Sequence, residues 1–350
     1  MTKRREIILK LLFLLAAVMM TLAIGEMAVR VISSHTLIYN IEMAKYAKAL
    51  KQRDPKGEVS HVHVPSRSAR LMGVDVTLNS LGHRSHELSK QKAPGTRRIL
   101  VLGASITMGW GVQADRVFTS VVEDRLNRTK PFGPDIAFEI ANAGIGNYNT
   151  YFELKLFQNQ YPIVKPDLVV IQYAINDAEP RSMGRNNWFL QHSLLADYFF
   201  DRFQHVRFAG GSNKDLFSFY SHLYQDNSDA WKQSLDSLAA IRDIAQKDGV
   251  PVVIMIVPDI HELSPDTPFR GLYAKMASAF QQLGIPTINT FDEFRKHFAA
   301  NVSSLWIQSD DPHPNASGHA LMAEILYNYL VEVDPLKLKK STRDPSVGTD

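Results

Sequence analysis

A serine in a short glycine-flanked motif is the candidate nucleophile of this chain. Residues 103–109 have the sequence Gly-Ala-Ser-Ile-Thr-Met-Gly and follow an apolar run at 99–102. A serine on a tight turn between a strand and a helix presents its hydroxyl at the edge of a sheet, and its N–H group can face developing negative charge. Serine is also a frequent helix cap, so Ser105 has a purely structural alternative.

A histidine near the end of the chain is the candidate general base. Residues 310–315 have the sequence Asp-Asp-Pro-His-Pro-Asn. A carboxylate three residues before a histidine can bend back within one loop, so we expect Asp310 to hold the Nδ1 proton of His313. A solvated loop and a metal site are the alternatives. The metal site is disfavoured because two prolines flank the histidine and no second histidine lies at helical spacing.

Two further motifs carry groups that could stabilise an oxyanion. Residues 142–147, Asn-Ala-Gly-Ile-Gly-Asn, contain glycines that let the backbone approach a ligand closely. Residues 173–177, Tyr-Ala-Ile-Asn-Asp, place an amide at Asn176 that can donate a hydrogen bond without titrating. Ordinary turns are the structural alternative for both. Asp177 and Glu179 could bind a cation or a hydroxylated substrate, although helix capping explains Asp177 more simply.

The elements between these motifs alternate regularly. Periodicity predicts strands at 99–102, 136–140, 168–171, 252–257 and 286–290, and helices at 115–127, 150–161, 231–247, 272–283 and 316–331. Strands that alternate with helices form a parallel sheet covered on both faces. Ligands of such sheets bind beyond the carboxyl ends of the strands, where the motifs at 103–109, 142–147 and 173–177 fall.

Taken together and in order, the motifs resemble the four sequence blocks of SGNH/GDSL hydrolases, a family of esterases and lipases. The matching positions are residues 103–106, Gly144 or Gly146, residues 174–177, and Asp310-x-x-His313 with the Pro-Asn that follows. The resemblance covers about residues 97–331, and residues 79–84 also resemble exported bacterial members.

This resemblance implies a fold and a set of roles. The fold is a three-layer α/β/α flavodoxin-like parallel sheet. Ser105 would be the nucleophile, His313 the base and Asp310 its orienter, while the N–H groups of Ser105 and Gly146 and the Asn176 amide would form the oxyanion hole.

The chain departs from the family pattern at two positions. Ala104 stands where the family has an aspartate that is not a triad member. Asn147 is an alternative to Gly146 as the backbone donor, because asparagine tolerates unusual dihedral angles.

Composition excludes several classes of function. The 350 residues include no cysteine, which rules out disulfides, cysteine-ligated zinc and a thiol nucleophile. The formal net charge is only +3, so no nucleic-acid partner is expected. We expect no cofactor and no metal. His61 and His63 could face a metal from one side of an extended chain, but a surface loop is the preferred interpretation.

The N-terminus predicts a membrane anchor. Lys3, Arg4 and Arg5 precede an apolar run at 7–25 that is just long enough to cross a bilayer as a helix. The positive flank should stay in the cytoplasm, which predicts a single-pass inner-membrane protein with a periplasmic catalytic domain. A cleaved signal peptide is the alternative, because residues 23–25, Ala-Ile-Gly, form a passable cleavage site. A buried core helix is a third interpretation.

The predicted organisation has four parts. Residues 1–32 form the cytoplasmic flank and anchor, 33–95 a membrane-proximal lead-in segment with a polar helix at 39–52, 96–334 the hydrolase domain, and 335–350 a disordered tail. The hydrolase domain carries an aromatic-rich helical insertion at about 180–228. This insertion could form a lid or an acceptor-binding wall at the catalytic edge, or a cap with its own small core.

The predicted function is that of an exported serine esterase acting on O-acyl esters, in particular acetyl groups of a cell-surface carbohydrate. An O-acetyltransferase with the same triad is an alternative, because exclusion of water from the acyl-enzyme decides between the two reactions. A lipase or thioesterase and an inactive carbohydrate-binding or assembly protein also remain open. The expected partners are an acylated small-molecule or polysaccharide substrate and the inner membrane; the sequence does not reveal which proteins, if any, bind the chain.

Overall fold

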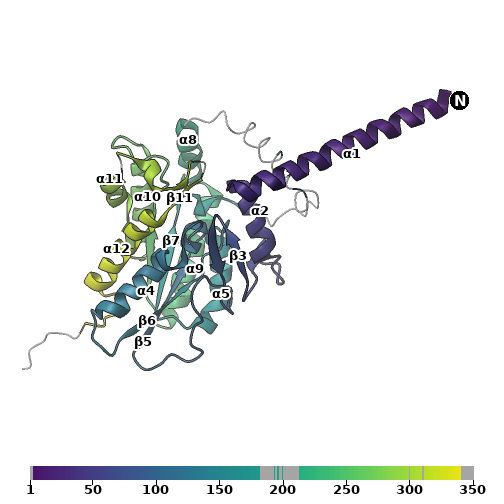
Figure 1. Ribbon diagram of the computed structural model, residues 1–350. Coiled ribbons are helices and arrows are strands. Elements are labelled where there is room, and N and C mark those ends of the chain that lie inside the picture. Colours follow the sequence, from purple (N-terminus) through teal and green to yellow (C-terminus); the bar gives the residue numbers. More distant parts are fainter. Residues whose placement is uncertain are drawn as a thin grey trace, which may run out of the picture.

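A five-stranded parallel sheet forms the centre of the protein (Figure 1), seen in a computed structural model. The structure describes residues 3–181, 213–298, 300–309 and 311–339 and the single positions 193, 195, 196 and 199. The strand order is β6-β5-β7-β8-β9. The strands are β5 (Thr96–Leu102), β6 (Ala137–Asn142), β7 (Leu168–Tyr173), β8 (Val252–Ile256) and β9 (Thr287–Asn289). Every residue of β7 and β8 is buried, as expected for strands covered on both faces.

Helices cover both faces of this sheet. The order reverses after β6, so right-handed connections place α4 and α5 on opposite faces. α4 packs against α12, and α5 packs against α9, while α10 packs on β8 and β9. The bounds are α4 (Phe118–Thr129), α5 (Thr150–Val164), α9 (Asp229–Lys247), α10 (Phe269–Gln282), α11 (Phe291–Phe298) and α12 (Ala316–Val333). The predicted three-layer α/β/α flavodoxin-like fold is therefore confirmed.

Three of these helices begin at polar residues that the sequence places just before them. The side chain of Asn149 accepts a hydrogen bond from the N–H of Phe152 at the start of α5, and that of Ser228 does the same for α9. Asn315, which follows the candidate base, accepts from the N–H groups of Ser317 and Gly318 at the start of α12. Asn315, two residues after His313, therefore fixes the start of helix α12.

The lead-in segment packs directly on the hydrolase domain. It forms α2 (Tyr39–Leu50), as the predicted polar helix, followed by β1 (Lys51–Gln52), β2 (Val62–His63), β3 (Ser68–Leu71) and β4 (Val74–Thr77). Its buried apolar side chains, among them Tyr46 and Leu50, share one cluster with Met108 and Trp110. Because Met108 and Trp110 lie just after Ser105, the lead-in segment supports the turn that carries the candidate nucleophile.

The long helix α1 (Lys3–His35) projects from the domain (Figure 1). Its segment Lys3–Ile32 has a mean hydropathy of 2.7 over its most apolar window and none of that window is buried. By length and composition it fits a membrane anchor or a signal sequence. A buried core helix, the third interpretation of this stretch, is excluded by its exposure.

Two predicted segments lie partly outside the described residues. Of the predicted insertion at 180–228, α8 (Asn213–Leu223) is described, whereas most of 182–212 is not. Of the predicted tail, residues 340–350 are not described. Residues 335–339 are held by Asp334, whose carboxylate accepts from the N–H groups of Leu338 and Lys339.

The carboxyl edge of the sheet carries the short elements that hold the candidate site. α3 (Ser105–Met108) follows β5, and the 3-10 turn η2 (Ile175–Ala178) follows β7. The antiparallel hairpin of β10 (Trp306–Gln308) and β11 (Asp311–Pro314) precedes α12. The remaining 3-10 turns are η1 (Ala114–Arg116) and η3 (Val302–Leu305). In Figure 1 this edge, marked by β11 and α8, lies on the side of the domain from which α1 leaves.

Candidate active site

Ser105, His313 and Asp311 form one hydrogen-bonded chain. The Ser105 Oγ lies 2.8 Å from Nε2 of His313, and Nδ1 of His313 lies 2.6 Å from Oδ1 of Asp311. The carboxylate can only accept, so Nδ1 carries the proton and the serine hydroxyl donates to Nε2. The Asp311 side chain is fully buried. This arrangement can remove the hydroxyl proton as the serine attacks a carbonyl carbon.

The carboxylate on His313 belongs to Asp311, which corrects the sequence prediction of Asp310. Residues Asp311–Pro314 form strand β11, in which alternate side chains share a face. Asp311 and His313 therefore point the same way, and the carboxylate also accepts from the backbone N–H of His313 at 3.1 Å. The prediction assumed a loop that bends back, whereas the chain here is extended. Asp310 itself lies outside the described residues.

Two aromatic side chains that the sequence did not point to contact the triad: Trp110 contacts Asp311, and Tyr39 contacts His313. The indole N–H of Trp110 donates to Oδ2 of Asp311 at 2.8 Å, so both carboxylate oxygens are occupied. The ring of Tyr39 stacks on His313 with 5.8 Å between ring centroids and 29° between planes. Tyr39 and Tyr46 are two helical turns apart on α2, and both contact Trp110. The spacing of Tyr39 and Tyr46, which places both on one face of a helix, is the sequence signal that could have indicated these aromatic contacts.

The nucleophile turn is held in place by glycine and by a buried arginine. Gly103 has φ of +152°, and a Cβ there would lie 2.1 Å from Oγ1 of Thr107, so only glycine fits. The buried guanidinium of Arg84, in the lead-in segment, donates to the carbonyl oxygens of Met108, Gly109 and Val112. These bonds close the end of α3 and fix the position of Ser105 at its beginning.

Asn176 shares a small pocket with Ser105 and His313. The described residues enclose about 130 Å³ between the catalytic loop, η2 and the residues after β8. Apolar side chains, including Ile106, Ile175 and Ile260, form much of its wall. No described residue hydrogen-bonds the Asn176 carboxamide, whose residue is partly exposed. An amide in this position can donate to an oxygen bound in the pocket.

Gly146 does not present its N–H to this pocket, which corrects the predicted oxyanion donor. That N–H donates to the hydroxyl of Tyr46 at 3.0 Å, because α2 inserts the tyrosine against the loop. A Cβ on Gly146 would lie 2.7 Å from the Tyr46 ring, so the glycine is needed for this close packing. The next residue, Asn147, has φ of +70°, and its N–H has no partner among the described residues. Of the two predicted backbone donors, the Asn147 N–H is thus the one without a partner among the described residues.

His61 and His63 are held by hydrogen bonds to other parts of the protein, which corrects the predicted surface loop. His63 is buried, with Nε2 2.7 Å from the Tyr46 hydroxyl and Nδ1 2.8 Å from the Gly82 carbonyl oxygen. His61 lies with Nε2 3.0 Å from the Gly146 carbonyl oxygen. Burial lowers the pKa of each ring to about 3, so both are neutral. No cluster of three potential metal ligands occurs among the described residues.

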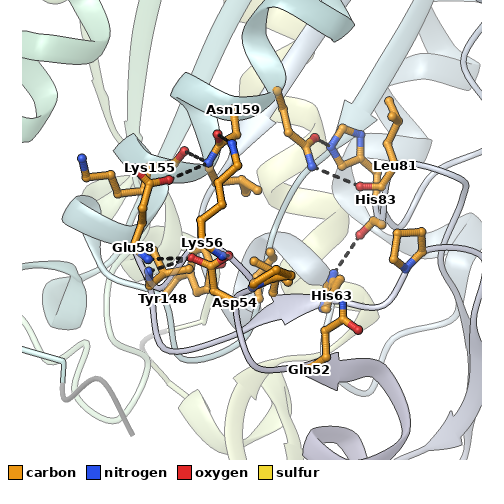
Figure 2. A pocket seen from close by; sticks show the side chains of 18 of the residues that line it. Gln52, Asp54, Lys56, Glu58, His63, Leu81, His83, Tyr148, Lys155 and Asn159 are labelled. Carbon is orange, nitrogen blue, oxygen red and sulfur yellow. Dashed lines mark hydrogen bonds between the residues drawn. The ribbon is translucent and has the colours of Figure 1, made fainter.

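A second cavity, of about 370 Å³, lies between the lead-in segment and α5 (Figure 2). Figure 2 shows Asn159, which hydrogen-bonds to Glu58 and Lys56, on one side of it, and His63 and His83 on the other. Its lining residues do not include Ser105, Asn176 or His313. This cavity is separate from the candidate active site.

Behind Asn176 lie two buried carboxyl groups. Oδ2 of Asp177 accepts from the N–H of Ala174 at 2.6 Å and closes the turn, in line with the predicted capping role. The other oxygen of Asp177 and both oxygens of Glu153 have no partner among the described residues. Burial raises the pKa of Asp177 to about 7, and burial together with the Asp177 charge raises the pKa of Glu153. The pair therefore retains a proton near neutral pH.

Comparison with solved structures identifies similar folds at low sequence identity. A two-domain esterase active on acetylated mannans is 16% identical with a TM-score of 0.45, and the match covers 72% of this chain and 53% of that one. This chain thus spans about half the length of that esterase. TesA is 17% identical with a TM-score of 0.43, covering 69% and 99% of the two chains. A catalytic mutant of an acetylxylan esterase from Geobacillus stearothermophilus is 16% identical with a TM-score of 0.43, covering 72% and 100%.

The sequence comparison is more specific. No curated protein sequence matches the chain. The model of the GDSL-like lipase/acylhydrolase family matches residues 101–321, which contain Ser105, Asn176 and His313. Because this match spans more than half of the chain, the protein belongs to the GDSL-like lipase/acylhydrolase family, the SGNH/GDSL hydrolases.

Proposed function

We propose that the protein is a membrane-anchored serine esterase that removes short O-acyl groups, acetyl above all, from carbohydrate outside the cytoplasm. The observation that carries the proposal is the series of hydrogen bonds from Ser105 through His313 to Asp311, with Asn176 lining the same pocket. A serine so placed has a base within reach, and the base has a buried partner that fixes its tautomer.

The proposed reaction has two steps. His313 takes the proton of Ser105 as Oγ attacks the ester carbonyl, and Asp311 stabilises the imidazolium that forms. The N–H groups of Ser105 and Asn147 and the amide of Asn176 hold the oxyanion. His313 then gives its proton to the leaving alcohol, and the acyl group stays on Ser105. In the second step His313 activates water, which releases the acid.

The size of the pocket supports a short acyl group. About 130 Å³ is well below the range of about 300–1,000 Å³ that is usual for drug-sized ligands. The apolar walls near Ile175 and Ile260 suit a methyl group, whereas a long acyl chain would need to leave the described pocket. The choice of a carbohydrate alcohol as the leaving group rests on the proposed location of the domain outside the cytoplasm.

The geometry of α1 supports anchoring. The helix runs unbroken past residues 23–25 to His35, and a basic flank precedes its apolar part. Only residues 36–38 separate it from α2, whose first residue Tyr39 stacks on His313. Oε of Glu26 also accepts hydrogen bonds from Ser193 and Leu195 of the hydrolase domain. The proposed active site therefore lies close to the membrane surface, within reach of carbohydrate presented there.

The test is ester hydrolysis by the full chain in detergent micelles. We expect release of nitrophenol from p-nitrophenyl acetate, a lower rate with the octanoate, and loss of turnover in Ser105→Ala and His313→Ala while their melting temperatures hold. Acetyl release from an acetylated oligosaccharide would then test the carbohydrate part. Unchanged turnover in Ser105→Ala would reject the proposed nucleophile, and a preference for the octanoate would reject the short acyl group. Faster consumption of ester in the presence of a sugar, with acetylated sugar as the product, would favour acetyl transfer instead.

A further inference from the structure

The peptide group that joins Gly146 to Asn147 is held from one side by the lead-in segment. The carbonyl oxygen of Gly146 accepts from Nζ of Lys51 at 2.8 Å and lies 3.0 Å from Nε2 of His61. A carbonyl oxygen can only accept, so His61 carries its proton on Nε2, and Nδ1 is left to accept from Ser60 Oγ at 2.8 Å. Two donors from the lead-in segment thus converge on one oxygen of the loop after β6.

Holding that oxygen also fixes the direction of the neighbouring N–H. In a trans peptide the C=O of one residue and the N–H of the next point in opposite directions, and no cis peptide occurs in the described residues. With the Gly146 oxygen turned toward Lys51 and His61, the N–H of Asn147 must point away from them. The φ of +70° at Asn147 belongs to this same arrangement.

The other side of the loop faces the catalytic elements. The N–H of Ile145 donates to the Gly103 carbonyl oxygen at 3.1 Å, and a Cβ on Gly144 would lie 2.3 Å from the Met108 nitrogen. Further along, Nδ2 of Asn149 donates to the Glu179 carbonyl oxygen at 2.9 Å. The loop therefore lies against the Ser105 turn and is tied to the turn that carries Asn176.

We propose that Lys51 and His61 are positioning residues that orient the Gly146–Asn147 peptide so that the Asn147 N–H faces the oxyanion formed at Ser105. The inference rests on the proposed acyl-enzyme function. If the peptide rotated by half a turn, a carbonyl oxygen would face the developing negative charge, and two partly buried donors, Lys51 and His61, would lose their acceptor. Leaving these donors without an acceptor is unfavourable, so the lead-in segment disfavours the inactive orientation.

The chemistry of Lys51 distinguishes this arrangement from simple packing. Burial, reinforced by the charge of Arg181, lowers the pKa of Lys51 to about 7. The amine lies 4.2 Å from the centroid of the Tyr46 ring, and the same tyrosine accepts from the Gly146 N–H. An apolar side chain would fill this space without the cost of a buried ammonium. The amine adds a hydrogen bond to the Gly146 carbonyl oxygen, and the direction of this oxygen sets the direction of the Asn147 N–H.

The test compares Lys51→Met with Lys51→Arg and with Lys48→Met in the full chain in detergent micelles. Lys48 is exposed near the end of α2, three residues before Lys51, so Lys48→Met is a control for the loss of a nearby lysine. For Lys51→Met we expect kcat for p-nitrophenyl acetate to fall about 10–100-fold with KM little changed, because an oxyanion donor acts mainly in the transition state. Lys51→Arg should restore most of the rate, and Lys48→Met should match the wild type. His61→Phe should act in the same direction as Lys51→Met.

A second readout separates positioning from general loss of structure. Phosphonylation of Ser105 by a fluorophosphonate places a phosphonyl oxygen in the oxyanion site, so its rate should fall in parallel with kcat. The melting temperature of Lys51→Met should hold or rise, because a buried ammonium is removed. Normal kcat and a normal phosphonylation rate in Lys51→Met would overturn the proposal, as would losses that track a lowered melting temperature.

The same readout distinguishes failure of this inference from failure of the proposed function. A wild type that is phosphonylated on Ser105 but hydrolyses no acyl ester would reject the proposed substrate, and the labelling rates of the variants would still decide the role of Lys51. A folded wild type that is not labelled at Ser105 would overturn both.

Discussion

The active site has two walls of different origin. The hydrolase domain supplies Ser105, Asn176 and His313, which lie at or beyond the carboxyl ends of strands and line one pocket. The lead-in segment supplies Tyr39 and Lys51, which contact the base and the loop after β6 from the other side. The first wall would touch the substrate, whereas the second acts on groups that do. Reactive groups and the groups that orient them are thus divided between two parts of the chain.

This difference matters for how the site stays ordered. The loop after β6 is held by hydrogen bonds from both walls, at Ile145 from one and at Gly146 from the other. The triad carboxylate is likewise held by the catalytic hairpin and by Trp110, whose ring packs among side chains of the lead-in segment. Changes in the first wall should therefore remove a chemical step, and changes in the second should weaken it. The following predictions, from the largest effect to the smallest, test that division.

Asp311→Asn should cause the largest loss. It removes the acceptor that holds Nδ1–H of His313 and favours the wrong tautomer, so we expect kcat to fall about 10⁴-fold. The matched control is Asp310→Asn, which should stay within a few-fold of the wild type in a p-nitrophenyl acetate assay. The reverse pattern would return the role to Asp310 and reject the hairpin geometry.

Asn176→Ala should lower kcat about 10²–10³-fold, because one oxyanion donor contributes about 2.7–4 kcal/mol to the barrier. The side chain has no described hydrogen-bond partner, so the melting temperature should hold. Steady-state kinetics and a thermal melt measure both quantities. Near-normal turnover would remove Asn176 from the first wall.

Trp110→Phe should have an intermediate effect. It keeps the aromatic packing but removes the N–H donor to Oδ2 of Asp311, and a hydrogen bond to a charged group is worth about 1.5–3 kcal/mol. We expect kcat to fall about 10–100-fold, with a lower melting temperature. An unchanged kcat would show that β11 alone is enough to orient the carboxylate.

Ionisable groups next to the two walls should also change the unfolding free energy with pH, in opposite directions. Asp177 and Glu153 have raised pKa values because they are buried, so the folded state holds protons that the unfolded state releases. For Asp177 this contribution to the unfolding free energy is lost as pH rises from about 4 through about 7, and Glu153 changes stability in the same direction. Glu153→Gln should therefore reduce the loss of unfolding free energy with rising pH, which urea unfolding between about pH 4 and about pH 7 measures.

Lys51 should change the unfolding free energy with pH in the opposite direction. Burial lowers its pKa to about 7, so its unfavourable charge is fully present below that pH and is relieved as pH rises toward about 10. Lys51→Met should therefore gain stability over the wild type at pH 6, and the gain should fade above about pH 8. A gain that does not change with pH would mean that Lys51 is not buried as described.

Tyr39→Ala should have the smallest effect. Its ring stacks on His313, and such an aromatic contact is worth about 0.5–1.5 kcal/mol beyond the area buried. We expect kcat/KM to fall about 2–10-fold, and Tyr39→Phe to retain the wild-type value because the ring remains. A loss as large as that of Asn176→Ala would move Tyr39 into the wall that touches the substrate.

The amino-acid sequence by itself determined the sheet and three members of the site. Continuous apolar runs such as 168–171 and helical periodicity such as that at 231–247 are local patterns, and they led to the parallel sheet and its covering helices. Ser105, Asn176 and His313 follow predicted elements at the catalytic edge, so their proximity follows from the topology of a parallel sheet.

Only the tertiary structure decided the remaining contacts. The choice between Asp310 and Asp311 depends on whether the chain is extended at β11, where side chains alternate, and that follows from pairing with β10. The roles of Tyr46, Lys51 and His61 depend on contacts with Gly146, about 100 residues away, that no local pattern encodes. A periodicity shows which face of an element is buried, but the partner on that face is fixed only when the whole chain packs.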